Sequence, residues 1–358
     1  MRTDRPNPRP RRRRSAPAGA ARRIAAALAA LLLGVPLAAP PAAAEAAPAG
    51  TAAARQAPVD LTGDLAVHDP ALVAGGSGRD WYVFSTGDAR RGDGNIQIRA
   101  SADGRDWRYV GTVWDTKPAW LAQEVPGVSN LWAPEVYQHD GTYYLYYSAS
   151  TFGQNRSVIG LATNTTLDPA DPGYRWVDQG KVAESHTTDD YNAIDPGVVE
   201  DAAGTPWLAF GSFWSGIRML RLEWPSGKPA AGQGAPLRIA DRGQPPNAIE
   251  APYILRRGDR YYLFVSFDTC CQGVNSTYRI AVGRSTSVTG PYVDRSGRPM
   301  LDGGGTVLLA GSGAMAGPGG QSVSGGHLAH HFYDADADGA PSLGIRTITW
   351  DSAGWPVL

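Results

Sequence analysis

The stretch Ala248-Ile-Glu-Ala-Pro-Tyr-Ile254, followed by Tyr261-Tyr-Leu-Phe-Val-Ser-Phe267, places one acid between apolar residues ahead of a turn and an aromatic run. The chain repeats this unit four more times with variations. The copies are Asp69-Pro before 81–86, Pro134-Glu135 before 143–148, Asp195-Pro before 206–213, and an acid-free Gly317-Pro-Gly-Gly320 before 327–334. Aromatic and β-branched runs bounded by Gly and Pro are typical of strands. Five strand units of this size predict an all-β chain folded as a five-bladed β-propeller with a central channel cleft.

The repeat also predicts where the chemistry lies. The first strand of each propeller blade lines the central channel, so equivalent positions of different blades converge there. Four of the five repeats carry an acid at this place: Asp69, Glu135, Asp195 and Glu250. Like charges raise one another's pKa, so such a cluster is costly and typical of a functional site. The alternative is that Asp-Pro and Glu-Ala-Pro are turns with solvated acids; it fits a single acid better than it fits all four.

The N-terminal 44 residues have the pattern of a secretory signal peptide. They contain nine Arg and one Asp, then an apolar stretch from Ile24 to about Ala39 and the small residues Ala42-Ala-Ala44. A membrane anchor is the weaker interpretation because the apolar run is short and interrupted by proline. Arg22-Arg23 leaves a twin-arginine signal open. We therefore expect a secreted, extracellular protein, with a disordered lead at 45–60 and a single catalytic domain at 61–358.

Charge and motif content exclude several classes of protein. The chain has 33 basic and 34 acidic residues; without the nine basic and one acidic residue of the leader, 24 and 33 remain, a net charge of −9. An acidic secreted protein does not indicate a nucleic-acid partner, and we expect a monomer without membrane association after signal cleavage. No CxxC pair, phosphate-binding loop or GxSxG elbow is present, which argues against zinc, nucleotide and esterase sites.

The two cysteines are adjacent, Cys270-Cys271. Neighbouring Cα atoms lie about 3.8 Å apart, below the usual range for a disulfide. Two buried thiols or a strained vicinal ring are the alternatives, and we favour the thiols.

Paired carboxylates without a metal cage fit glycoside hydrolysis, in which one acid stays protonated and another stays ionised. Glu250 is flanked by Ile249 and Ala251-Pro252, which would desolvate it and suit a general acid. Asp69 follows His68, whose ring would help to keep it charged and suit a general base. Asp195 is the candidate for raising the pKa of Glu250 by repulsion.

Seven segments together resemble glycoside hydrolase family 43, and most closely its endo-1,5-α-L-arabinanases. They are Val67-His-Asp-Pro70, Trp132-Ala-Pro-Glu135, 148–156, Asn192-Ala-Ile-Asp-Pro196, 210–215, Ile249-Glu-Ala-Pro-Tyr253, and 267–271 with Ser276-Thr-Tyr278. The resemblance covers about residue 65 to the C-terminus. It implies a five-bladed propeller that cleaves the polysaccharide arabinan with inversion. It also implies Asp69 as the general base, Glu250 as the general acid, and Asp195 as the residue that raises the pKa of the acid and orients it.

The resemblance also suggests sugar contacts. Asn192, Ala193 and Ile194, together with Ser212, Phe213 and Trp214, match stretches that line the family's cleft. Trp132 and Phe152 are candidates for stacking on sugars, although aromatic residues in the core of a blade are the alternative. Glu135 matches a family acid that we interpret as structural.

The resemblance also implies a bound metal ion. Family members hold a single ion, usually calcium, in the channel through a His of a Gly-Pro-Gly-His motif, but this chain has Gly320 there. His331 is the remaining candidate ligand for a calcium ion, and we expect no organic cofactor. The segment 334–339 resembles the start of an EF-hand, but it lacks the closing Glu and is interpreted as an acidic loop.

The sequence therefore predicts a secreted hydrolase that cuts internal α-1,5 bonds of arabinan. The nearest alternatives on the same fold are an exo-acting α-L-arabinofuranosidase or β-xylosidase, which would differ in the loops around the cleft. A non-catalytic sugar-binding propeller is the alternative from another class.

Overall fold

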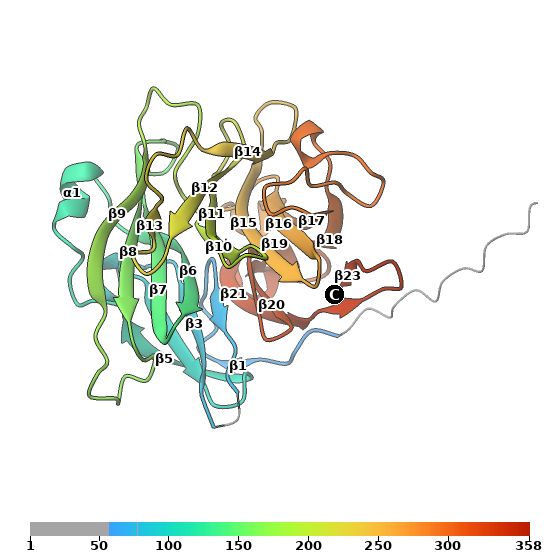
Figure 1. Ribbon diagram of the computed structural model, residues 1–358. Coiled ribbons are helices and arrows are strands. Elements are labelled where there is room, and N and C mark those ends of the chain that lie inside the picture. The colour runs from blue at the N-terminus through green and yellow to red at the C-terminus, as the bar shows by residue number, and fades with distance from the viewer. Residues whose placement is uncertain (1–56, 77) are drawn as a thin grey trace, which may run out of the picture. The chain divides into compact units, whose positions relative to one another are not determined.

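The computed structural model describes residues 57–76 and 78–358, and their strands form an all-β propeller of five blades (Figure 1). The predicted fold class is confirmed. The expected signal peptide and most of the expected lead lie outside the described residues. No helix in the described part of the chain is long and apolar enough to cross a bilayer.

Each blade is an antiparallel meander in which the chain runs from the innermost strand outward, except that β1 is added to the outer edge of blade I, parallel to β5. Blade I contains β1 (Thr62–Gly63), β2 (Ala71–Val73), β3 (Trp81–Ser85), β4 (Gln97–Ser101) and β5 (Asp106–Thr112); blade II contains β6 (Leu131–His139), β7 (Thr142–Ala149), β8 (Ser157–Asn164) and β9 (Val177–Ser185); blade III contains β10 (Gly197–Glu200), β11 (Pro206–Phe210), β12 (Ile217–Glu223), β13 (Lys228–Pro229) and β14 (Leu237–Ala240); blade IV contains β15 (Ile249–Arg257), β16 (Arg260–Phe267), β17 (Arg279–Ser285) and β18 (Thr306–Ala310); and blade V contains β19 (Met315–Ser324), β20 (His327–Asp334) and β21 (Ala340–Thr347).

The remaining elements are short. They are α1 (Trp120–Glu124), the 3₁₀ turns Gly92–Gly94, Gly273–Asn275, Met300–Asp302 and Ala335–Ala337, and a hairpin of β22 (Thr349–Trp350) and β23 (Pro356–Val357).

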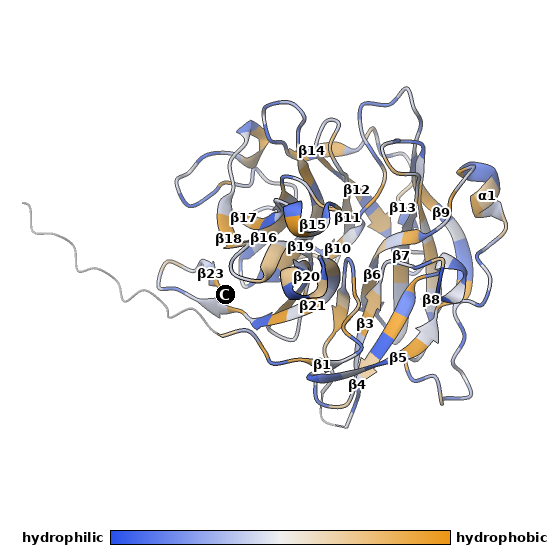
Figure 2. Ribbon diagram, turned by 180° about the vertical axis from the view of Figure 1, so that it is seen from behind, coloured by the Kyte–Doolittle hydropathy of each residue, from blue (hydrophilic) through white to orange (hydrophobic). Residues whose placement is uncertain are grey.

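Five hydrophobic cores hold the ring together, one between each pair of neighbouring blades. Side chains along a strand alternate between the two faces of its sheet, and both faces of each blade are covered. In β16, Tyr261, Leu263 and Val265 pack toward blade III, whereas Tyr262 and Phe264 pack toward blade V. The aromatic runs of the sequence are therefore apolar on both faces, and Figure 2 shows that hydrophilic residues concentrate in the connecting loops.

The N-terminal segment closes the ring between blades V and I. The amide of Val59 donates to Ile345 O at 3.0 Å, and the amide of Leu343 donates to Leu65 O at 2.9 Å, so the segment lies along β21. Its strand β1 then pairs in parallel with β5 of blade I. Val59 is thus hydrogen-bonded to blade V, although it lies within the segment 45–60 that we expected to be a disordered lead.

Candidate active site

The inner strands of all five blades begin on one face of the propeller, and the site is built on that face. The strand register shows this in blade IV, where Ile249 at the start of β15 lies opposite Phe267 at the end of β16, and Arg279 lies opposite Ala310. The loops after β7, β11, β16 and β18 therefore all lie on this face, which we call the catalytic face.

All five blades contribute to the lining of a narrow central cavity of about 30 Å³, and in each blade one of the lining residues has left-handed backbone. These residues are Asp69, Ala133, Asp195, Ala251 and Gly320, with φ values of 51°, 42°, 59°, 51° and 59°. The first four precede a proline, which disfavours the right-handed helical region for the residue before it. Left-handed backbone at non-glycine residues costs about 1–3 kcal/mol each and is concentrated at functional sites. The shared conformation identifies these five residues as the equivalent positions of the repeat.

These equivalent positions correct the alignment of the four acids that the sequence repeat predicted. Asp69 and Asp195 occupy the equivalent position, but Glu135 lies two residues after Ala133 and Glu250 lies one residue before Ala251. Strand pairing shifts register between Glu250 and Tyr253 and between Trp132 and Glu135. Such irregularities redirect side chains. The spacing of the acids alone did not show them.

Asp69 is held as a carboxylate. Its Oδ2 accepts hydrogen bonds from His68 Nδ1 and from Thr86 Oγ1, each at 2.7 Å. Burial favours the neutral acid and is the largest influence. The nearby His68 charge and hydrogen bond, then His331 and Thr86, oppose it and together hold the pKa of Asp69 well below its usual range. A buried carboxylate that stays ionised suits the expected general base.

The pKa of Glu250 is raised to near neutral pH. Its side chain is buried; Ser212 Oγ donates to its Oε2 at 2.5 Å, and the Tyr278 hydroxyl donates to its Oε1. Burial raises the pKa of Glu250 to about 7, and the charge of Asp69 adds to the rise, whereas the Ser212 hydrogen bond opposes it. An acid with this pKa can donate a proton at neutral pH, as a general acid must.

Asp195 is coupled to Glu250. Its amide donates to Ser148 Oγ at 3.0 Å, and its Oδ2 accepts the amide of Ala251, next to the acid, at 3.1 Å. Burial, followed by the charges of Glu250 and Asp69, raises the pKa of Asp195 well above its usual value. Because repulsion is reciprocal, ionisation of Asp195 disfavours ionisation of Glu250. The structure therefore brings together all three acids that the sequence singled out as catalytic.

Glu135 takes no part in this group of hydrogen bonds. Burial raises its pKa to about 8, and it accepts the amides of Val198 and Val136. It lies in the central cavity, between blades II and III. This placement agrees with a structural role.

The expected sugar contacts separate into three groups. Ala193 and Ile194 are buried, and Ala193 belongs to the core between blades II and III. Asn192 is also buried, with its Oδ1 accepting a hydrogen bond from Ser157 Oγ at 2.7 Å. Ala193 is therefore a core residue, and the Asn192 side chain links its loop to β8.

The second group contacts the catalytic acid or its strand. Ser212 donates directly to Glu250, so it acts on the acid. Phe213 donates its amide to Ile249 O at 3.0 Å, beside the acid.

The third group comprises exposed or partly exposed aromatic residues on the catalytic face. Phe152, in the loop after β7, is 79% exposed, and Trp214, in the loop after β11, is 39% exposed. Trp132 is partly buried at the start of β6. Phe152 and Trp214 lie outside the blade cores, so they are available for stacking on a ligand.

The residues near His331 do not fit a calcium site. Atoms of His68, Asp69 and His331 lie within 4.8 Å of one another. His331 Nδ1 accepts the amide of Asp69 at 3.1 Å, and burial lowers the pKa of His331 well below its usual value. The neutral ring therefore carries its proton on Nε2, which is buried without a hydrogen-bond partner among the described residues. A protonated nitrogen does not ligate a cation, and calcium prefers six to eight oxygen ligands. The expected calcium ion stays a prediction that this cluster does not support.

Gly320 is required by the same cluster. A Cβ at this position would lie 2.5 Å from Asp69 Oδ1 and 2.8 Å from His331 Nδ1. The glycine thus allows the base and the histidine ring to approach each other, and any side chain there would displace one of them.

The prediction of two buried thiols was wrong. Cys270 and Cys271 form a vicinal disulfide, and Cys271 is exposed in the loop after β16. The amide of Cys271 donates to the Tyr333 hydroxyl at 2.7 Å, and this hydroxyl contacts His68 Nε2 at 2.8 Å. The disulfide loop is therefore linked through two side chains to Asp69.

Sequence reasoning gave no role to three residues of the site: Tyr278 on Glu250, Thr86 on Asp69, and Tyr333 on His68. Tyr278 and Tyr333 stand in segments that we had singled out for their pattern, so the signal was present. Their partners became visible only once the blades were placed side by side.

Two neighbouring buried acids, one with a lowered pKa and one with a raised pKa, are the pair that a glycoside hydrolase uses as base and acid. The family model described as glycosyl hydrolases family 43 matches residues 61–356. The chain belongs to this family.

Similar proteins agree with this assignment. The chain is 44% identical to an extracellular endo-α-(1→5)-L-arabinanase of Bacillus subtilis over 293 residues, which cover 81% of this chain and 87% of the relative. It is 43% identical to an extracellular exo-α-(1→5)-L-arabinofuranosidase of Cellvibrio japonicus over 304 residues, which cover 81% and 85%. The solved structure of a family 43 endo-arabinanase from Bacillus licheniformis superposes with a TM-score of 0.78 at 44% identity, covering 84% of this chain and all of the other.

Proposed function

We propose that this protein hydrolyses internal α-1,5-L-arabinofuranosidic bonds of arabinan in a single displacement with inversion. The proposal rests on one observation: the pKa values of two acids are shifted in opposite directions. The pKa of Asp69 is lowered, and the pKa of Glu250 is raised to about 7. The endo-arabinanases among the similar proteins support arabinan as the substrate.

In the proposed reaction, Asp69 takes a proton from a water molecule that attacks the anomeric carbon. Glu250 gives its proton to the departing glycosidic oxygen on the other side of the sugar. Asp195 holds the amide of Ala251 beside Glu250, and because the two buried acids are coupled, the site disfavours the ionisation of both at once. His68, Thr86 and Ser212 orient the two reacting carboxyl groups.

We infer that the protein acts outside the cell. The pattern of residues 1–44 supports export, as do the extracellular relatives of Bacillus subtilis and Cellvibrio japonicus.

An exo-acting hydrolase on the same fold is the second candidate. The observation in its favour is the Cellvibrio relative, whose identity of 43% almost equals that of the endo-acting relative.

Products from linear 1,5-arabinan test the proposal, with Glu250→Gln as the acid-deficient control. A ladder of oligosaccharides from the wild type at early times, and none from the variant, is expected. A single short product from the first time point would move the function to the exo candidate. Proton NMR of the new reducing end should show the β-anomer first, and the α-anomer first would exclude inversion. Binding of arabinan without any hydrolysis would favour the sugar-binding propeller.

A further inference from the structure

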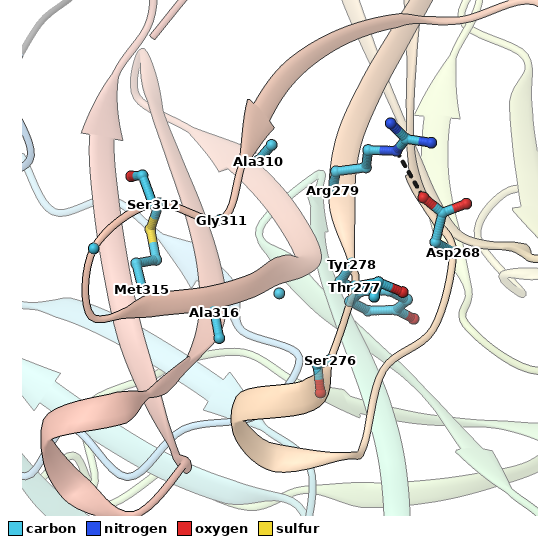
Figure 3. A pocket seen from close by; sticks show the side chains of 12 residues that line it. Asp268, Ser276, Thr277, Tyr278, Arg279, Ala310, Gly311, Ser312, Met315 and Ala316 are labelled. Atoms are coloured by element: carbon cyan, nitrogen blue, oxygen red, sulfur yellow. Dashed lines mark ion pairs between the residues drawn. The ribbon is translucent and has the colours of Figure 1, made fainter.

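The disulfide loop comprises residues 268–278, which connect β16 to β17 on the catalytic face. Both ends of this loop are fixed in place. Arg279 Nε donates to Asp268 Oδ2 at 2.7 Å, and Figure 3 shows this ion pair. The amide of Thr277 donates to Thr269 O at 2.9 Å. The disulfide lies between these two closures, so a change in its bonding affects the tip of the loop and leaves the ends paired.

A chain of hydrogen bonds leads from this tip to the proposed base. The amide of Cys271 donates to the Tyr333 hydroxyl at 2.7 Å. This hydroxyl contacts His68 Nε2 at 2.8 Å, and His68 Nδ1 contacts Asp69 Oδ2 at 2.7 Å. Cys271 Sγ itself lies 3.9 Å from His68 Nε2. The second cysteine is therefore close to the ring that holds the base, both through its amide and through its sulfur.

The disulfide determines where this amide points. A bond between the sulfurs of neighbouring cysteines closes a small ring, and the peptide nitrogen of Cys271 is one of its atoms. Cys271 has a φ of 65°, in the left-handed region that residues other than glycine seldom adopt. An open chain favours other conformations at this residue, so opening the ring frees the Cys271 amide to turn away from Tyr333.

Loss of the amide would be felt along the whole chain of hydrogen bonds. The Tyr333 hydroxyl carries one proton, and the donor from Cys271 fixes the orientation of its oxygen toward His68. Hydrogen bonds in such a chain strengthen one another, so removing the first one weakens the next. The ring of His68 would then hold the Asp69 carboxylate less firmly.

The disulfide is open to attack from solvent on one side. Cys271 is exposed, whereas Cys270 is partly buried. A thiolate from a small dithiol would form a bond to Cys271 Sγ, and the Cys270 sulfur would leave with the electron pair and take up a proton. The second thiol of the reagent would then attack the reagent's own sulfur in this mixed disulfide, which releases Cys271 as a thiol. Two electrons pass to the protein, and the reagent becomes a cyclic disulfide.

We propose that the disulfide between Cys270 and Cys271 is a modification site for small thiols, through which the redox state of the surroundings controls the base. In the oxidised pair the Cys271 amide holds Tyr333, which keeps His68 in place. In the reduced pair this hold is lost and hydrolysis slows. The proposal rests on the proposed function, which makes Asp69 the base, whereas the link from the disulfide to His68 does not depend on it.

Reduction of the native protein by dithiothreitol provides the test. The sequence contains two cysteines, so the reagent has no other disulfide to act on. We expect kcat on linear 1,5-arabinan to fall about three- to tenfold, the effect of losing one hydrogen bond, and to return on reoxidation. Alkylation followed by mass measurement counts the thiols in each state. The matched control is the double variant Cys270→Ser with Cys271→Ser, which should hydrolyse arabinan as slowly as the reduced wild type and ignore the reagent.

Tyr333→Phe distinguishes control of the base from a general loosening of the loop. This variant lacks the hydroxyl that joins Cys271 to His68, so reduction should leave its kcat unchanged. NMR signals of the His68 ring nitrogens give a readout that needs no substrate. They should shift on reduction of the wild type and stay in place on reduction of Tyr333→Phe.

Three results would overturn the proposal: cysteines that are alkylated without any reductant, a disulfide that excess dithiothreitol leaves intact in the native protein, or a reduced wild type with unchanged kcat and unchanged His68 signals. An equal fall of kcat in Tyr333→Phe would also overturn it, because the effect would then bypass His68. A wild type that leaves arabinan uncut while its His68 signals shift on reduction would overturn the proposed function and keep the link from the disulfide to His68.

Discussion

Removing the hydroxyl of Ser212 should move the basic limb of the pH–activity profile to higher pH. Ser212 Oγ donates to Glu250 Oε2 at 2.5 Å, and a donor stabilises the ionised carboxylate over the neutral acid. The hydrogen bond lowers the pKa of Glu250, against the burial that raises it to about 7. In Ser212→Ala this opposition is lost, so the pKa of the general acid rises.

The magnitude follows from the strength of the bond. A hydrogen bond to a charged group is worth about 1.5–3 kcal/mol, and one pKa unit corresponds to 1.36 kcal/mol. The basic limb of kcat/KM should therefore move up by about one to two pH units. The Tyr278 hydroxyl still donates to Glu250 Oε1, so the carboxyl group keeps its place and activity at lower pH should persist.

The assay is kcat/KM on linear 1,5-arabinan across the pH range. The control is Ser226→Ala, because Ser226 is exposed and its hydroxyl bonds only to Glu223 O and the amide of Lys228 in the described contacts. A basic limb that stays in place, or that moves to lower pH, would refute the role of Glu250 as the acid whose ionisation sets that limb.

Two further predictions concern the base and the closure of the ring. In Tyr333→Phe, His68 loses its hydrogen bond of 2.8 Å and holds Asp69 less firmly, so the acidic limb of kcat/KM should move to higher pH and kcat should fall about three- to tenfold; an unchanged acidic limb would contradict this. In Arg99→Met, Asp64 loses a fully buried partner at 2.9 Å and keeps only Arg91. Urea unfolding should show a loss of about 2–4 kcal/mol, and a loss below about 0.5 kcal/mol would show that the buried ion pair does not stabilise the fold.

The repeat of acid, turn and aromatic run was sufficient to predict the propeller, because each run is apolar on both faces and must be covered twice. It was also sufficient to find the three acids. It did not show that Glu250 and Glu135 are out of register with Asp69 and Asp195, since an irregularity of strand pairing leaves no mark in spacing.

The partners of these acids were harder to predict than the acids themselves. Ser212 was expected to contact sugar, but it bonds Glu250 from the neighbouring blade. Tyr333 reaches His68 across 265 positions of sequence. Contacts between blades depend on how the ring closes, and local sequence carries no information on that closure. The separation of adjacent Cα atoms lies below the usual range for a disulfide, so the sequence analysis favoured two thiols. The structure forms the vicinal disulfide nevertheless, so this average separation did not predict the outcome.

The closure of the ring by its first residues also fixes when the enzyme becomes competent. Val59 can form its hydrogen bond only after Ile345 has been synthesised. A growing chain that has not reached blade V is therefore an open arc with an unpaired edge. That arc already contains Asp69, Asp195 and Glu250, but it lacks His331 and Tyr333, which hold the base in place. The proposed site is therefore complete only when blade V has joined the ring.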